Sequence, residues 1–203
     1  IVDLHNNLRT RLIKLRLGKK SGTFDKLNRQ KWLKVNLKID HLPNVHIVDR
    51  YLEAAKELGV KKDQLGLDYF IPEKDEVPLE WLPETHQKEY VAYAIGAQHV
   101  TKRLPLGRMI ELCDKINKPI ILLGGKEDAA IGEEISNFFE RTDDSEHMEP
   151  GLKDLNKKAL LYNACGKFNL NQSASILKNA RYVFTHDTGL MHIAAAFKKE
   201  IYS

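Results

Sequence analysis

The 203-residue sequence contains only two cysteines, Cys113 and Cys165, which are far apart and lie in apolar surroundings. This scarcity excludes a disulfide-rich scaffold and favours two buried free thiols. No apolar run is long enough to span a bilayer, and no signal-peptide pattern stands at the start. Because 42% of the residues are apolar, the chain can still bury a sizeable core. We therefore expect a folded protein in a reducing, cytoplasmic setting.

Two common phosphate-binding motifs are missing as well. The sequence has no Walker loop, and Gly124-Gly125 is not a dinucleotide-binding fingerprint. Acidic residues are scarce in residues 1–40, which hold eleven Lys and Arg against three Asp, although the whole chain has a net charge of only +4. No nucleic-acid-binding motif accompanies this basic segment. An anionic partner (a phosphorylated acceptor, a membrane surface or a nucleic acid) and a merely solvated helix face both fit the charge.

The chain opens in a strand-like pattern at Ile1 and closes as another strand begins, which predicts an internal piece of a longer protein. Residues 1–70 predict part of an N-terminal α/β domain, with a short strand and then helices over 7–17, 24–38 and 46–59. Residues 71–87 are rich in proline and acid, show no clear period and predict a linker or an exposed connection. Residues 88–203 predict a second domain, cut short at its C-terminal end.

This second domain shows a regular alternation of short apolar runs and amphipathic segments. Strands are predicted over 89–96, 118–125, 159–166 and 181–186, and helices over 104–116, 127–141, 171–180 and 188–199, with a polar loop over 142–156. Alternation of this kind with short loops is typical of an α/β fold built on a doubly wound, Rossmann-like parallel sheet.

Each predicted strand ends in glycine together with polar or charged residues. In a doubly wound sheet these carboxyl ends share one edge, where ligands bind. The sequences that follow the four strands are Gly96-Ala97-Gln98-His99, Gly124-Gly125-Lys126-Glu127-Asp128, Gly166-Lys167-Phe168 and His186-Asp187-Thr188-Gly189. Four such loops on one edge predict a binding cleft.

The last of these loops predicts an anion site. Thr188 can cap the helix that follows, and Gly189 lets the backbone approach a ligand closely. The free amides at the helix start favour a phosphate or diphosphate, and His192 can face the same anion. Lys102 can neutralise that anion.

Two further loops add features that suit a nucleotide-sugar. Glu127 is placed to accept hydrogen bonds from sugar hydroxyls, and Phe168 can lie against a base ring. A simpler alternative exists for each residue. Thr188-Gly189 can be a cap only, His192 and Phe168 can be core residues, and Glu127 can simply favour a helix start. The other functions that fit are a metal-dependent hydrolase built on His186, Asp187 and His192, and a non-catalytic nucleotide-binding module.

Four stretches resemble glycosyltransferase family 9, the bacterial heptosyltransferases of lipopolysaccharide core assembly. They are "THDTGLMHIAAAF", "YVAYAIGAQHVTKRLP" with "PIILLGGKED", and "VDLHNNLRT" on the acceptor side. The resemblance implies a GT-B fold, with two Rossmann-like domains. It also implies an inverting transfer of heptose, without metal or other cofactor, from ADP-heptose to a lipid-linked saccharide acceptor at the inner face of the bacterial inner membrane.

By matching positions, the resemblance also implies roles for single residues. Asp187, Thr188 and Gly189 would meet the donor's sugar and diphosphate, and His192 would close the motif. Lys102 would pair with the phosphates, and Gln98 stands where some members have a hydroxyl residue for this purpose. Glu127 would hold the ribose, Phe168 would lie near the adenine, and Arg9 would face the acceptor. The family's catalytic aspartate follows a strand that this chain does not contain, so no residue here is assigned as the general base.

Overall fold

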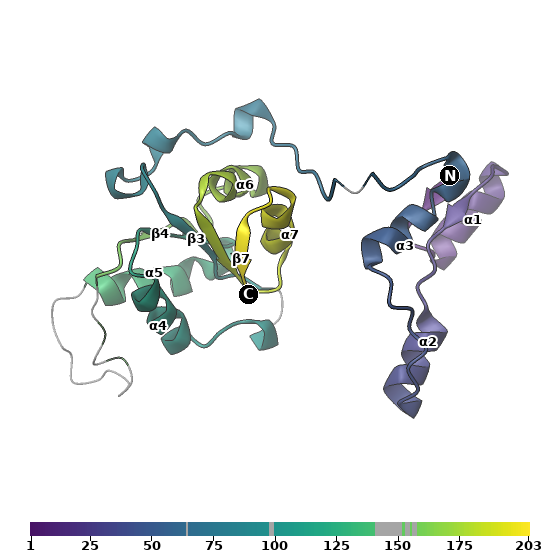
Figure 1. Ribbon diagram of the computed structural model, residues 1–203, viewed down its shortest axis with the longest axis horizontal. Coiled ribbons are helices and arrows are strands. Elements are labelled where there is room, and N and C mark those ends of the chain that lie inside the picture. The colour runs from purple at the N-terminus through teal and green to yellow at the C-terminus, as the bar shows by residue number, and fades with distance from the viewer. Residues whose placement is uncertain (64, 98–99, 141–151, 153–154, 156–157) are drawn as a thin grey trace. The chain divides into compact units, whose positions relative to one another are not determined.

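The computed structural model describes residues 1–63, 65–97, 100–140, 152, 155 and 158–203. The chain forms two compact units, Ile1–Gly66 and Leu67–Ser203 (Figure 1). Most of the polar loop predicted over 142–156 lies outside the described residues. Within the part of the chain that the structure describes, no helix has both the length and the apolar character needed to cross a bilayer.

The first unit contains two short parallel strands and three helices. Strand β1 (Val2–Asp3) pairs with β2 (Gly22–Thr23). Helix α1 (Leu8–Leu17) ends at Gly18, which adopts the left-handed conformation that glycine favours. The helices α2 (Asn28–Trp32) and α3 (Ile47–Glu53) are shorter than predicted. They continue only as a π-helical turn over Leu33–Leu37 and a 3₁₀ turn over Lys56–Leu58.

The late start of α2 has a local cause. Leu27 lies in the left-handed region, with φ of 52°, so residues 24–27 cannot continue the helix backwards. The Asp25 carboxylate accepts a hydrogen bond from the Leu27 amide at 2.9 Å and stabilises this turn. A side chain that bonds its own backbone in this way competes with helix formation. The predicted helix over 24–38 therefore loses its first turn.

The second unit is a five-stranded parallel sheet in the order β5-β4-β3-β6-β7. Its strands are β3 (Val91–Ala94), β4 (Ile120–Leu123), β5 (Leu161–Asn163), β6 (Tyr182–Thr185) and β7 (Glu200–Tyr202). The chain first winds from β3 to β5 and then returns to the other side of β3. This reversal makes the β3–β6 boundary the topological switch point, where a crevice opens at the carboxyl ends. The predicted doubly wound sheet is confirmed.

Helices cover both faces of this sheet (Figure 1). The α4 (Leu106–Ile116) and α5 (Ala129–Glu140) helices pack against one face, and α6 (Leu170–Asn179) and α7 (Gly189–Ala196) against the other. Successive strand residues point to opposite faces, so Ile120 and Ile121 enter different core clusters. This double burial explains the continuous apolar run of β4.

Both cysteines lie in this core as free thiols, as expected. Burial raises the pKa of Cys113 and of Cys165 to about 12. Neither thiol is therefore ionised at neutral pH.

The segment expected to be a linker, residues 71–87, packs on the second unit instead. Val77 and Leu82 are buried in the core cluster that also contains Ile176 of α6. This segment forms three 3₁₀ turns, and a proline precedes each of them. The turns are Glu73–Asp75, Leu79–Trp81 and Glu84–His86. These short turns produce neither a helical nor a strand period, so the sequence pattern conceals the burial of the segment.

Candidate functional site

A cavity of about 440 Å³ lies at the switch point of the sheet. Gly96 and Ala97 line it from the loop after β3, and Thr188 and Gly189 from the loop after β6. The loops after β4 and β5 complete the wall with Glu127, Asp128, Phe168 and neighbouring residues. We call this space the switch-point cavity. It brings together four residues that the sequence analysis singled out: Glu127, Phe168, Thr188 and Gly189.

The start of α7 leaves room for an anion. Thr188 has an extended backbone, and its side chain makes no capping hydrogen bond, contrary to the expected cap. Its hydroxyl lies 3.4 Å from that of Thr185 instead. A side chain placed on Gly189 would meet no described atom within 4 Å, so packing in the protein does not require glycine here. The uncapped amides and the open space suit a phosphate group at this helix N-terminus.

Glu127 and Phe168 lie on different walls of the cavity. Glu127 sits on the 3₁₀ turn Lys126–Asp128, and its carboxylate is exposed. It folds back over Gly125, where an added Cβ would be only 2.3 Å from Glu127 Oε2. Phe168 is half-buried and packs against the core under α6 and α7. One wall thus offers hydrogen-bond acceptors and the other an aromatic ring.

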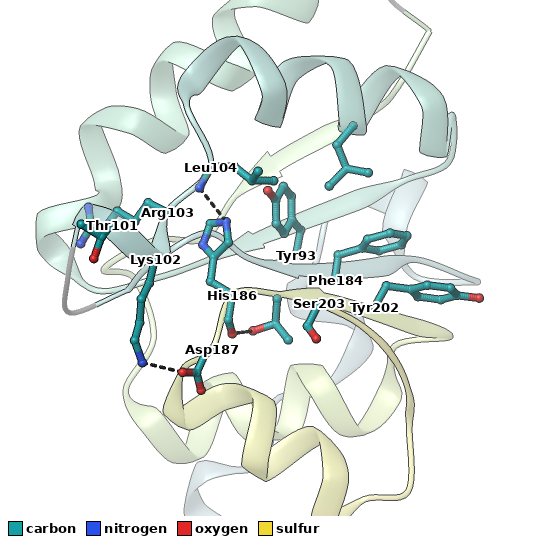
Figure 2. Close-up of a pocket in the computed structure, with 12 residues that line it drawn as sticks. Tyr93, Thr101, Lys102, Arg103, Leu104, Phe184, His186, Asp187, Tyr202 and Ser203 are labelled. Carbon is teal, nitrogen blue, oxygen red and sulfur yellow. Dashed lines mark hydrogen bonds and ion pairs between the residues drawn. The ribbon is translucent and has the colours of Figure 1, made fainter. Parts of the chain in front are cut away.

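Lys102 and Asp187 form an exposed ion pair beside the switch-point cavity (Figure 2). Their Nζ and Oδ2 atoms are 2.5 Å apart. The hydrogen bond and charge of Lys102 lower the pKa of Asp187, with a smaller contribution from His192. Lys102 and Asp187 line a second cavity of about 470 Å³, which we call the flanking cavity. Arg103 and His186 also line it. The turn 186–188 therefore separates two cavities.

His186 is not available as a metal ligand. The ring is buried; its Nδ1 lies 3.1 Å from the carbonyl of Ile95, and its Nε2 accepts the amide hydrogen of Leu104 at 3.2 Å (Figure 2). Burial lowers the pKa of His186, which favours the neutral ring that this arrangement needs. The described residues contain no group of three or more metal-ligating side chains. Since both ring nitrogens are occupied, the geometry does not support the metal-dependent hydrolase.

Two residues of the site were not assigned a role from the sequence. Asp128 is 2% exposed, and its carboxylate pairs with Arg103, the neighbour of Lys102 in the chain. In the sequence Arg103 directly follows Lys102, and Asp128 directly follows Glu127. The predicted roles went to Lys102 and Glu127, and none was assigned to Arg103 or Asp128. The sequence shows only that a basic residue, Arg103, comes after β3 and that an acidic residue, Asp128, comes after the neighbouring strand β4.

Three further residues were predicted for the site: Gln98, His192 and Arg9. Gln98 falls among the residues that the structure does not describe. His192 is exposed on α7 and lines neither cavity. Arg9 belongs to the first unit, where it is exposed in the first turn of α1. Within the second unit, His192 therefore lies away from the walls of both cavities.

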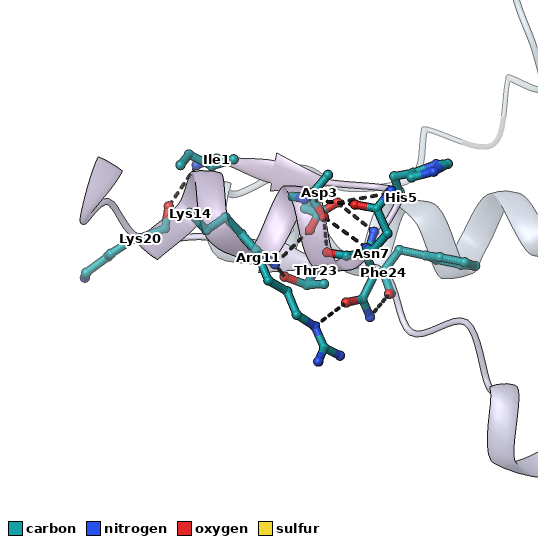
Figure 3. Close-up of polar contacts among 11 residues, drawn as sticks. Ile1, Asp3, His5, Asn7, Arg11, Lys14, Lys20, Thr23 and Phe24 are labelled. Carbon is teal, nitrogen blue, oxygen red and sulfur yellow. Dashed lines mark hydrogen bonds and ion pairs between the residues drawn. The ribbon is translucent and has the colours of Figure 1, made fainter. Parts of the chain in front are cut away.

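The helix that carries Arg9 is held by a network around Asp3 (Figure 3). The Asp3 carboxylate accepts hydrogen bonds from the amides of His5 and Asn6 and pairs with Lys14 at 2.8 Å. The hydrogen bond from Lys14 and the bond from the Asn6 amide hold the pKa of Asp3 well below its usual range. Asn7 then caps α1 by a reciprocal pair of hydrogen bonds with Thr10. These contacts fix the start of α1.

Comparison with known proteins identifies relatives that match most of the chain. One relative is lipooligosaccharide heptosyltransferase 2 of Haemophilus ducreyi, which is 28% identical over 167 residues, or 75% of this chain and 44% of the relative. The chain thus spans less than half the length of that curated relative.

Two solved structures share the fold. That of E. coli ADP-heptose LPS heptosyltransferase II superposes with a TM-score of 0.63 at 18% identity, covering 98% of this chain and 60% of that one. A family 9 glycosyltransferase from Veillonella parvula gives a TM-score of 0.58 at 21% identity, covering 78% and 43%. These likenesses confirm the expected α/β fold of the GT-B type.

A family model described as glycosyltransferase family 9 (heptosyltransferase) matches residues 1–201. The match covers nearly the whole chain and includes all four loops of the switch-point edge. The chain belongs to glycosyltransferase family 9.

Proposed function

We propose that the protein containing this chain transfers heptose, or a related sugar, from a nucleotide-sugar to an acceptor of the lipopolysaccharide core. The donor is ADP-heptose, a proposal supported by the name of the similar E. coli enzyme. The observation that carries the proposal is the switch-point cavity, where an uncapped helix start, a free carboxylate and an aromatic ring face one space.

Each wall of this cavity suits one part of such a donor. The amides at the start of α7 receive the diphosphate, and Gly189 leaves room for its oxygens. Glu127 accepts hydrogen bonds from the ribose hydroxyls, and Phe168 lies beside the adenine. Asp187 and Lys102 line the neighbouring flanking cavity, where Asp187 faces the sugar of the donor. Lys102 exchanges its bond to Asp187 for one to the diphosphate.

The proposed reaction is a single displacement with inversion at the anomeric carbon. A base takes the proton of an acceptor hydroxyl as its oxygen forms the new bond to that carbon. The bond from the anomeric carbon to the diphosphate oxygen breaks, and ADP leaves with the electron pair. Lys102 and the α7 amides stabilise the charge that develops on this leaving group, so the proposal needs no metal.

The acceptor is a lipid-linked saccharide at the cytoplasmic face of the inner membrane. The excess of Lys and Arg in residues 1–40 supports an anionic partner for the first unit. Arg9, exposed at the start of α1, is the residue that we assign to the acceptor side.

Calorimetric titration of the chain with ADP, UDP and ADP-heptose tests the donor. We expect ADP to bind at least about tenfold more tightly than UDP, because a purine covers more of an aromatic wall than a pyrimidine. Addition of a chelator is expected to leave the binding unchanged. Equal affinities for ADP and UDP, or no binding by the folded chain, would contradict the proposed donor.

A further inference from the structure

A buried ion pair of Asp128 and Arg103 lies at the wall of the switch-point cavity, which Asp128 lines. Asp128 Oδ2 accepts a hydrogen bond from the Gly125 amide at 2.9 Å. Its other oxygen, Oδ1, is 3.1 Å from Arg103 Nη1. The Asp128 side chain is 3% exposed and that of Arg103 22%. This ion pair is therefore largely shielded from water, and its charges are only weakly screened.

The adjoining glycines show how tightly the Asp128 carboxylate is held. A Cβ added to Gly96, after β3, would lie 2.3 Å from Asp128 Oδ2. A Cβ added to Gly124, after β4, would lie 2.8 Å from the same oxygen. Asp128 thus fills the space between the turns that end β3 and β4, and it fixes the backbone of both turns.

Arg103 connects this carboxylate to the loop that carries Lys102. Its Nε donates a hydrogen bond to the carbonyl of Ala97 at 2.8 Å. In Figure 2 the Lys102 side chain runs toward Asp187, whereas that of Arg103 runs away from it. The next residue, Leu104, is held in turn by His186. Three consecutive residues are therefore held by contacts to other parts of the unit: Lys102 by Asp187, Arg103 by Ala97 and Asp128, and Leu104 by His186. Together these contacts fix the position of Lys102.

The charge of Asp128 is a disadvantage for the proposed ligand. A buried carboxylate in the wall of a cavity that receives a diphosphate repels it, and this repulsion is strong where water is scarce. We propose that Arg103 is a positioning residue of the donor site. It neutralises the buried Asp128 carboxylate, so that this charge does not repel the diphosphate, without itself contacting the phosphates. This inference rests on the proposed nucleotide-sugar function.

The test compares ADP with adenosine, which lacks the phosphates, in calorimetric titrations of the chain. Arg103→Met keeps the apolar stem and removes the charge. We expect it to weaken ADP binding about tenfold or more, while adenosine binding changes less than about twofold. In the double variant Arg103→Met/Asp128→Asn the amide oxygen still accepts the Gly125 hydrogen bond. ADP affinity should then return to within about threefold of the wild type.

The possible results separate the explanations. If the double variant binds ADP as weakly as Arg103→Met, the loss of affinity does not come from the unpaired Asp128 charge, and the proposed role of Arg103 is overturned. If adenosine and ADP lose affinity equally, Arg103 acts only through packing, which also overturns it. The double variant contains no unpaired buried charge, so it decides between these roles even if Arg103→Met fails to fold.

A matched control and the wild type complete the design. Arg108→Met removes an arginine of α4 that pairs with Glu111 on the surface, and it should leave both affinities unchanged. A folded wild-type chain that binds neither compound would overturn the proposed function and this inference together. Wild-type binding combined with either contrary pattern above would overturn the inference alone.

Discussion

Gly189 combines two properties at the scale of a single residue. It stands at the first position of α7, and a side chain added to it would extend into open space. The preceding Thr188 does not cap the helix with its side chain. A larger residue at Gly189 therefore costs the fold little but occupies the volume proposed for the diphosphate.

Gly189→Val should abolish measurable ADP binding. The stability of the fold should change by only about 0.5 kcal/mol or less, because valine is no less favourable than glycine in a helix and meets no described atom here. Calorimetry with ADP and a thermal melt of the same variant measure both effects. Ala195→Val, on the exposed side of the same helix, is the control for helix propensity. A variant that melts earlier but still binds ADP would show that the turn is only structural.

Lys102→Ala should lower kcat of the complete enzyme by about a hundredfold, because Lys102 is proposed to stabilise charge that develops on the leaving diphosphate. The melting temperature should hardly change, since exposed ion pairs contribute little to stability. Steady-state kinetics measure the first effect, and Lys115→Ala on the exposed side of α4 serves as the control. Unchanged kinetics would show that the pair with Asp187 is merely a surface contact.

Where a loop follows a strand directly, the sequence is sufficient to place its residues at the sheet edge, and the roles assigned to these residues stay predictions. Glu127, Phe168, Thr188 and Gly189 meet at one cavity because the parallel sheet places all four loop starts on one edge. The role of Arg103 could not be predicted, because its partner Asp128 is 25 positions further along the chain in a different loop. Pairing across loops depends on side-chain directions, which no local pattern encodes.

At the scale of elements, the regular strands and helices of the second unit were predictable, and the segment 67–87 was not. Its attachment to α6 depends on contacts across about 95 residues. Asp75 accepts hydrogen bonds from the side chains of Asn169 and Asn171, each at 3.0 Å. These bonds from Asn169 and Asn171 lower the pKa of Asp75. Asn169 also caps α6, so the segment is fixed to the start of that helix.

His86 connects the same segment to the sheet. The buried ring places Nε2 3.2 Å from the carbonyls of Ile120 in β4 and Leu160 before β5. Its Nδ1 lies 2.9 Å from the Thr85 hydroxyl. A neutral ring satisfies these partners by donating from Nε2 and accepting at Nδ1. Burial lowers the pKa of His86, so protonation opposes the folded state.

The stability of the second unit should consequently fall with pH below about 6.5, the pKa of an unfolded histidine. Above that value the ring is neutral in both states, and its contribution to stability is fully present. Calorimetric melts between pH 7 and pH 5 measure the trend. His86→Gln should cost about 2 kcal/mol at pH 7 and show a shallower decline. An equally steep decline in the variant would assign the pH dependence to other groups, among them His186.

At the scale of the whole molecule, the chain consists of two units that differ in their degree of burial. The sheet unit encloses two core clusters, whereas α1, α2 and α3 of the first unit contain no fully buried residue. Hydrophobic burial is the main source of folding free energy, so stability is concentrated in Leu67–Ser203. All residues of the switch-point cavity belong to that unit.

A shortened chain of residues 67–203 should therefore fold alone and bind ADP within about threefold of the 203-residue chain. A second shortened chain of residues 88–203 lacks Val77, Leu82, Asp75 and His86. Loss of the two buried aliphatic side chains alone should cost about 4 kcal/mol, so this chain should melt far earlier or not fold. Circular dichroism melts and ADP titrations of both chains provide the measurement. Equal stability of the two would show that residues 71–87 are the linker that the sequence pattern predicts.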